Sequence, residues 1–268
     1  MDNTKFLGIL ALVALAAVSP ADAKPKADFD QGIDARAALD DAKASQAPAP
    51  TPISRPSPSG AGCRVDLRGQ KLTLKDGFNF ARVVYRVDDQ CRLIKSAEEY
   101  LKKAPASKAA VVGRNGMVEK EVKLRRSTSA KQAVTTGCTV EVVEKDVIGA
   151  TMITLDNGTS WSIDNSQILE ANEHVSIFGN LDWWFVTGDP TTNLSWIQEP
   201  YSAQSQATGG FYCSAVGPIS NYVCGTAGYQ ITLEGDMTFD ATGTCSGQYG
   251  YSGTVVPLGS VTATLTRN

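Results

Sequence analysis

The chain has 268 residues, of which 42% are hydrophobic and 20% are charged, with a formal net charge of −3 and a single histidine. It contains no C-x-x-C pair, no G-x-x-x-x-G-K-[ST] phosphate loop and no G-x-S-x-G elbow. These absences argue against a zinc site, a nucleotide-binding P-loop and the catalytic triad of an α/β-hydrolase.

Charge is distributed unevenly along the chain. Residues 1–138 carry 23 Lys and Arg against 15 Asp and Glu, net +8, whereas residues 139–268 carry 2 against 13, net −11. Such asymmetry indicates two modules with different surroundings or partners.

The N-terminus has the pattern of a secretory signal peptide over residues 1–23. Lys5 precedes an apolar run over residues 6–18, and Ala21-Asp22-Ala23 forms an A-x-A cleavage pattern before Lys24. The apolar run is shorter than the roughly 20 residues that span a bilayer. We therefore expect a secreted protein, extracellular or periplasmic, with no membrane insertion once the signal is removed.

Residues 24–61 are predicted to be a disordered tether. Residues 24–46 are charged and alanine-rich, and residues 47–61 contain five prolines. Proline-rich segments of this kind are extended and semi-rigid, so the folded part is expected to begin near Cys63.

All six cysteines follow the signal peptide, and an even set in an exported chain is typical of disulfides. Sequence alone leaves 15 pairings open. A predicted hairpin over residues 211–224 places Cys213 opposite Cys224. If these two are bonded, Cys63–Cys91 is the local candidate among the remaining cysteines, and Cys138–Cys245 is the long-range pair.

Residues 62–132 are predicted to form a small basic α+β module. Strand patterns run from Cys63 to about Ile94, a capping box over residues 96–99 predicts a short helix, and MVEKEVKL predicts another strand. The basic segment over residues 100–132 has three interpretations: a patch for an anionic polymer, a solvated strand and loop, or a dibasic processing site at Arg125-Arg126 if the source is eukaryotic. It has no aromatic residue to stack a base between Leu101 and Lys131, which argues against specific nucleic-acid binding.

Residues 133–268 are predicted to form an acidic, antiparallel β-sandwich or open barrel. Turn signals predict three hairpins, centred on Asn157-Gly158, on residues 217–220 and on residues 234–236. In the last of these, alternation places Ile231, Leu233, Met237 and Phe239 on one buried face. The fold class expected for the whole chain is therefore mainly β.

The segment DWWFVTGDPTTNLSWIQ, residues 182–198, contains three of the four tryptophans. A five-residue loop over residues 188–192 would make it a hairpin with apolar residues on both faces. Either it is sandwiched between two layers, or one face is exposed as an aromatic binding platform. On the second interpretation the ligand-binding residues are Trp183, Trp184, Trp196 and Tyr201.

No catalytic, metal-binding or cofactor-binding residues are predicted. His174 follows Glu173 and is interpreted as a surface histidine, and no D-x-D-x-D-G calcium loop is present. Glycoside hydrolysis needs two carboxylates about 5–9.5 Å apart. No spacing singles out a pair among the candidate acids, which are Asp182, Asp189, Glu199, Glu234, Asp236 and Asp240.

These observations favour a non-catalytic binding or structural protein of the cell envelope or extracellular space. Its expected partner is a glycan or an envelope protein that contacts the aromatic segment. The alternative is a secreted carboxylate-dependent hydrolase such as a glycosidase.

Overall fold

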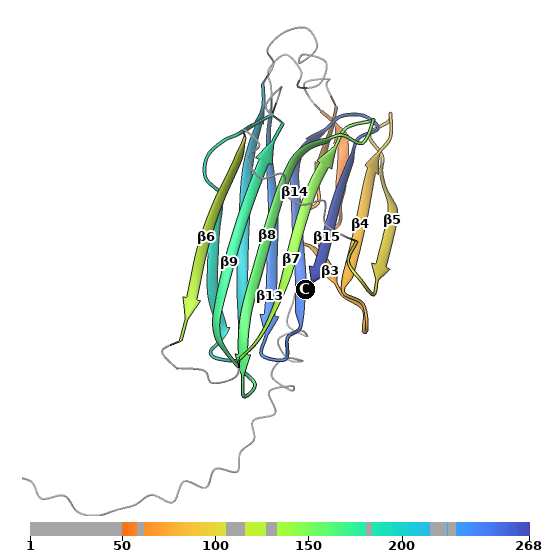
Figure 1. Cartoon of the computed structure of the whole chain (residues 1–268). Coiled ribbons are helices and arrows are strands. Elements are labelled where there is room, and N and C mark those ends of the chain that lie inside the picture. The colour runs from red at the N-terminus through yellow and green to blue at the C-terminus, as the bar shows by residue number, and fades with distance from the viewer. Residues whose placement is uncertain are drawn as a thin grey trace, which may run out of the picture. The chain divides into compact units, whose positions relative to one another are not determined.

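The computed structural model describes residues 50–57, 62–105, 116–126, 133–180, 184–214, 224 and 229–268. Within these residues, fifteen strands form two antiparallel sheets that pack face to face as a sandwich and do not close into a barrel (Figure 1). The predicted mainly β fold is confirmed. The predicted signal peptide lies outside the described residues, among which there is no helix long and apolar enough to cross a membrane.

One sheet has eight strands, and its main path runs β1-β2-β14-β13-β12-β10, with β3 paired to β14 and β11 paired to β12. Its strands are β1 (Ile53–Pro56), β2 (Cys63–Asp66), β3 (Gln70–Thr73), β10 (Trp184–Val186), β11 (Thr191–Gln198), β12 (Ser202–Cys213), β13 (Tyr229–Asp240) and β14 (Cys245–Val255).

The other sheet has seven strands in the order β5-β4-β15-β7-β8-β9-β6 and forms the front layer in Figure 1. Its strands are β4 (Phe80–Val87), β5 (Leu93–Leu101), β6 (Met117–Arg125), β7 (Val134–Lys145), β8 (Thr151–Asp164), β9 (Gln167–Gly179) and β15 (Ser260–Arg267).

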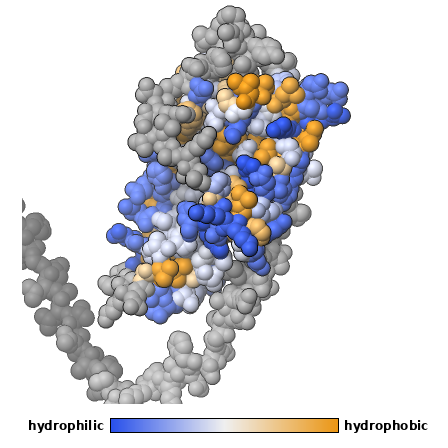
Figure 2. Space-filling view, turned by 45° about the vertical axis from the view of Figure 1, so that its right-hand side comes forward, coloured by the Kyte–Doolittle hydropathy of each residue, from blue (hydrophilic) through white to orange (hydrophobic). Residues whose placement is uncertain are grey.

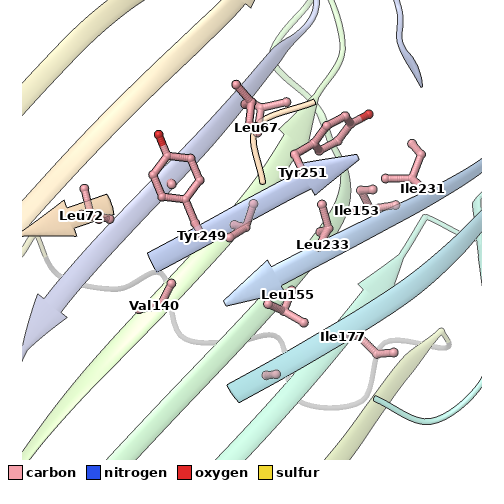
Figure 3. Close-up of a cluster of buried hydrophobic side chains, with 14 of the residues drawn as sticks. Leu67, Leu72, Val140, Ile153, Leu155, Ile177, Ile231, Leu233, Tyr249 and Tyr251 are labelled. Carbon is pink, nitrogen blue, oxygen red and sulfur yellow. The ribbon is translucent and has the colours of Figure 1, made fainter. Parts of the chain in front are cut away.

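The core lies between the two sheets and is made by alternate residues of each long strand, as the two-residue period of a strand requires. Figure 3 shows apolar side chains from β13 and β14 pointing toward those of β7, β8 and β9. Odd-numbered positions of β13 from Ile231 to Phe239 are buried, which confirms the predicted face of Ile231, Leu233, Met237 and Phe239. On the outside, Figure 2 shows apolar side chains as small patches separated by hydrophilic residues.

A small polar cluster is buried in this core. The Asn157 amide donates to Ser205 Oγ and to the carbonyl oxygen of Gly235, each at 2.7 Å, and the Ser205 hydroxyl donates to Glu173 Oε1 at 2.5 Å. The cluster joins β8 and β9 of one sheet to β12 and β13 of the other. Because each bond is made in a dry interior, losing one partner would leave the other unsatisfied at a cost of about 1–3 kcal/mol.

Two of the predicted hairpins are wrong, and the third, centred on residues 217–220, lies outside the described residues. Asn157-Gly158 and Gly235 lie in the middle of continuous strands, β8 and β13. The turn between β8 and β9 is instead Asn165-Ser166, whose φ angles of 50° and 57° are those that a two-residue hairpin turn of type I′ needs. The tertiary contacts of Asn157 override its local turn preference, because its amide is buried and bonded to the opposite sheet.

The predicted helix at residues 96–99 is also wrong, because this segment belongs to β5. Ser96 lies at a register shift between β5 and β4, and its hydroxyl donates to the carbonyl oxygen of Val84 at 3.2 Å. The serine thus makes a cross-strand bond in place of a helix cap. Pairing with β4 supplies backbone partners for a whole strand, which outweighs one local capping signal.

The described residues between 62 and 126 do not form a sheet of their own. β2 and β3 pair with β14, whereas β4 pairs with β15 and β6 with β9, and residues 47–268 make one compact unit. Part of the predicted tether is also folded, since β1 pairs with β2. These long-range pairings could not be read from local composition.

Candidate binding surface on the eight-stranded sheet

The predicted aromatic hairpin is absent from the described residues. β10 and β11 do not pair with each other; both pair with β12, β10 along Phe211–Cys213 and β11 along Ser202–Thr208. Residues 187–190 therefore interrupt one edge of the sheet and do not reverse the chain. A single long partner strand, β12, aligns the two segments end to end.

This arrangement changes the status of the predicted binding residues. Trp184 is fully buried, with its ring edge-on to Tyr229 at a centroid distance of 5.6 Å, so its faces are not available to a ligand. Trp196 is half-buried and packs against the core, whereas Tyr201 is 38% exposed just after β11. Trp183 lies outside the described residues.

A different pair of aromatic side chains faces outward. Phe185 of β10 is paired with Tyr212 of β12, and their exposed fractions are 42% and 37%. Their inward neighbours, Trp184 and Cys213, are fully buried. The same alternation that buries one aromatic residue of this edge therefore presents the next to solvent.

The rest of this outer face carries amide and hydroxyl groups arranged in cross-strand rows. In one row, Gln204 Nε2 donates to Ser195 Oγ at 3.2 Å, and the hydroxyls of Thr238 and Ser246 are 2.7 Å apart. In the next row, Asn193 Nδ2 donates to Gln206 Oε1 at 3.0 Å. Gln248 and Thr208 extend the same face, since they pair with Asp236 and Glu234 of β13.

Two acids lie near the centre of this face. Burial raises the pKa of Asp236 to about 6, and the charge of neighbouring Glu234 adds to the increase. Burial also raises the pKa of Glu234, while Arg68 opposes that change. Both carboxylates project from the same side of one strand, two residues apart. They do not face each other across a cleft, as the acid and nucleophile of a glycosidase do.

The other described acids of the predicted candidate set have structural partners or lie in loops. Both carboxylate oxygens of Asp240 accept hydrogen bonds within the turn after β13, one of them from the Thr244 hydroxyl at 2.6 Å. Glu199 lies 4.0 Å from Arg126 in an ion pair, and Asp189 lies in the interruption between β10 and β11. Asp182 lies outside the described residues.

The basic segment is described only in part, at residues 100–105 and 116–126. In the second of these stretches the charges alternate along the edge strand β6, where Lys123 pairs with Glu121 at 3.4 Å and Arg125 with Glu170 at 3.3 Å. Binding of an anionic polymer by this segment stays a prediction.

Three disulfides join the six cysteines. Cys138–Cys245 links β7 of the seven-stranded sheet to β14 of the eight-stranded sheet. Cys63–Cys91 links β2 of the eight-stranded sheet to the turn between β4 and β5, and Cys213–Cys224 joins two cysteines 11 residues apart. These are the pairings that the sequence indicated, and they are compatible with an extracellular protein.

Sequence reasoning missed the outward pair and the amide rows. The signal was present in β12, where Gln204, Gln206 and Thr208 alternate with Ser205 and Ala207. Such alternation predicts one polar face but does not say which strands extend it.

Comparisons of this chain with protein-family models, with curated proteins and with solved structures found no match.

Proposed function

We propose that this protein is an exported, non-catalytic binding protein that holds an extended, neutral glycan on the outer face of its eight-stranded sheet. The observation that carries the proposal is the exposed pair of Phe185 and Tyr212 on the same face as the rows of amide and hydroxyl groups. An aromatic ring offers a large, rigid apolar surface to the C–H face of a sugar. Amides and hydroxyls donate and accept the hydrogen bonds that sugar hydroxyls make.

The dimensions of the face suit a chain-like ligand. From Tyr212 to Gln204 the strand β12 rises about 26 Å, at roughly 3.3 Å per residue. Outward-facing polar side chains run over that whole length on β13, from Gln230 to Thr238, and on β12 from Gln204 to Thr208. A linear glycan that lies along the strands would contact the aromatic pair at one end and the amide rows at the other.

The charge of the face favours a neutral ligand. Glu234 and Asp236 stand at its centre, and a polyanion lying along β12 and β13 would be repelled by them. Export is supported by the predicted signal peptide at residues 1–23 and by the three disulfides.

The test is binding of the mature protein to insoluble polysaccharides, namely cellulose, chitin, a mixed-linkage β-glucan and peptidoglycan. The double variant Phe185→Ala/Tyr212→Ala should bind roughly thirtyfold more weakly, since each of the two stacked rings contributes about 1 kcal/mol. Tyr201→Ala is the matched control, because Tyr201 is equally exposed but follows β11 at the far end of β12.

Three results would overturn the proposal. The first is that none of the polysaccharides is bound. The second is that only Tyr201→Ala weakens binding, which would place the site elsewhere. The third is release of reducing sugar by the wild-type protein, which would show that the protein is a hydrolase.

A further inference from the structure

An open hollow of about 430 Å³ lies on the outer face of the seven-stranded sheet, over β7, β8 and β9. Small-molecule sites usually have volumes of about 300–1,000 Å³. The side chains that face it include Thr139, Ser160, Asn172 and the only histidine of the chain, His174.

Two outward-facing glycines create the hollow. Gly158 is paired with Thr139 on one side and with His174 on the other, and Gly137 is paired with Ser160. Both positions lack a side chain in the middle of long strands, so the surrounding polar side chains stand around a floor of bare backbone.

The fold does not require glycine at position 158. Its φ is not in the left-handed region, and an added Cβ would have Thr139 Oγ1 at 3.5 Å and the carbonyl oxygen of His174 at 3.7 Å as its nearest neighbours. These are ordinary van der Waals contacts. Gly235 is different, because a Cβ there would lie 2.8 Å from Leu155 Cδ2 in the core.

Glycine in the middle of a strand destabilises it relative to alanine. Where neither a turn nor core packing explains such a glycine, close approach of another molecule is a recognised reason for it. At Gly158 the one local consequence of the missing side chain is the hollow.

The chemistry around the hollow selects the ligand. Hydroxyl, amide and imidazole groups surround it, and Glu121, which also faces it, is paired with Lys123 at 3.4 Å. Among the described residues, those around it include no Phe, Tyr or Trp, no lysine and no arginine, so neither a large apolar ligand nor an anion is favoured. The described residues also hold no group of three or more His, Cys, Asp or Glu suited to a metal ion.

We propose that this hollow is a second binding site, specific for a small, neutral, polyhydroxylated ligand such as a single sugar residue. It lies on the sheet opposite Phe185 and Tyr212, so the two proposals stand or fall independently.

The experiment is an NMR titration of the isotopically labelled folded protein with the methyl glycosides of glucose, galactose and mannose, with N-acetylglucosamine and with inorganic phosphate. We expect at least one of the sugars to shift the backbone amide signals of Gly158 and His174 in a saturable way. Gly158→Ala should weaken this binding and Gly158→Val should abolish it, while the thermal unfolding midpoint stays at or above that of the wild type.

The matched control is Thr154→Val, on the same strand and the same outer face but beside Val143 and Phe178, outside the hollow. It should leave the sugar-induced shifts of Gly158 and His174 unchanged. The proposal is overturned if no sugar gives saturable shifts, if phosphate binds in preference to every sugar, or if Gly158→Val binds as well as the wild type.

Discussion

Glu144 is fully buried between the two sheets, and the variant Glu144→Gln is expected to remove a loss of stability that the wild type suffers as pH rises. Glu144 faces inward from β7, and the Tyr251 hydroxyl of β14 donates to its Oε2 at 3.0 Å. Burial raises the pKa of this carboxyl from 4.5 to about 8, although the hydrogen bond from Tyr251 opposes the increase. At neutral pH the folded protein therefore holds a proton there that the unfolded chain has released.

The sign and size of the effect follow from that proton. Below pH 4.5 both states are protonated, and above about pH 8 both are ionised. Between these values the free energy of unfolding falls as pH rises, by about 1.4 kcal/mol per pH unit for this one group. From pH 5.5 to 7.5 the contribution of Glu144 should therefore decrease by roughly 2–3 kcal/mol. Glutamine is neutral throughout this range and keeps an acceptor for the Tyr251 hydroxyl.

The assay is urea unfolding of the disulfide-intact protein at pH 5.5, 6.5 and 7.5, followed by tryptophan fluorescence and linear extrapolation. The informative quantity is the difference in free energy of unfolding between the wild type and Glu144→Gln. Other acids with a raised pKa, such as Asp156 and Asp236, are present in both proteins and cancel in that difference. If the difference is the same at all three pH values, Glu144 does not carry a buried proton and the reasoning is wrong.

Three further variants test the packing of the sandwich by the same unfolding assay. Gly235→Ala should lower the free energy of unfolding by about 1–3 kcal/mol, because its Cβ would lie 2.8 Å from Leu155 Cδ2; an unchanged value would show that the sheets can separate at no cost. Trp161→Phe should cost about 2 kcal/mol, since the Trp161 Nε1–H donates to the buried backbone carbonyl of residue 240 at 3.0 Å; a cost below 0.5 kcal/mol would mean that water replaces the bond. Replacing both Cys138 and Cys245 with alanine should cost about 5 kcal/mol, because this disulfide closes a 107-residue loop that spans the two sheets; an unfolding midpoint equal to that of the wild type would contradict this.

The strand faces could be predicted because they depend on a local period. Along β13, apolar residues at alternate positions mark the buried face whatever strand lies beside it. The sequence also suggested the disulfide pairs. Cys213 and Cys224 are opposed in a predicted hairpin and Cys63 and Cys91 are a short-range pair, which leaves Cys138 and Cys245.

The strand ends and partners could not be predicted because glycine and serine give the same local signal in different tertiary settings. Gly158 and Gly235 resemble turn glycines, but one faces a surface hollow and the other accommodates Leu155 of the opposite sheet. Ser96 resembles a helix cap, but its hydroxyl bonds to Val84 of the adjacent strand.

The candidate binding surface shows the same division. The aromatic segment at residues 182–198 could be identified from the sequence, as could the rule that adjacent strand residues point to opposite sides. The predicted hairpin, however, paired the first half of this segment with the second half. In the structure both halves pair with β12, so Trp184 is buried and Phe185 is exposed beside Tyr212.

The sequence by itself thus determined the β class and the alternation of faces, because these depend on composition or on residues close together in the chain. The tertiary structure alone decided which strands are neighbours, which glycines bend the chain and which aromatic rings meet solvent. Backbone hydrogen bonds between strands are made by every residue alike, so the choice of partner depends on how distant side chains pack once the two sheets meet.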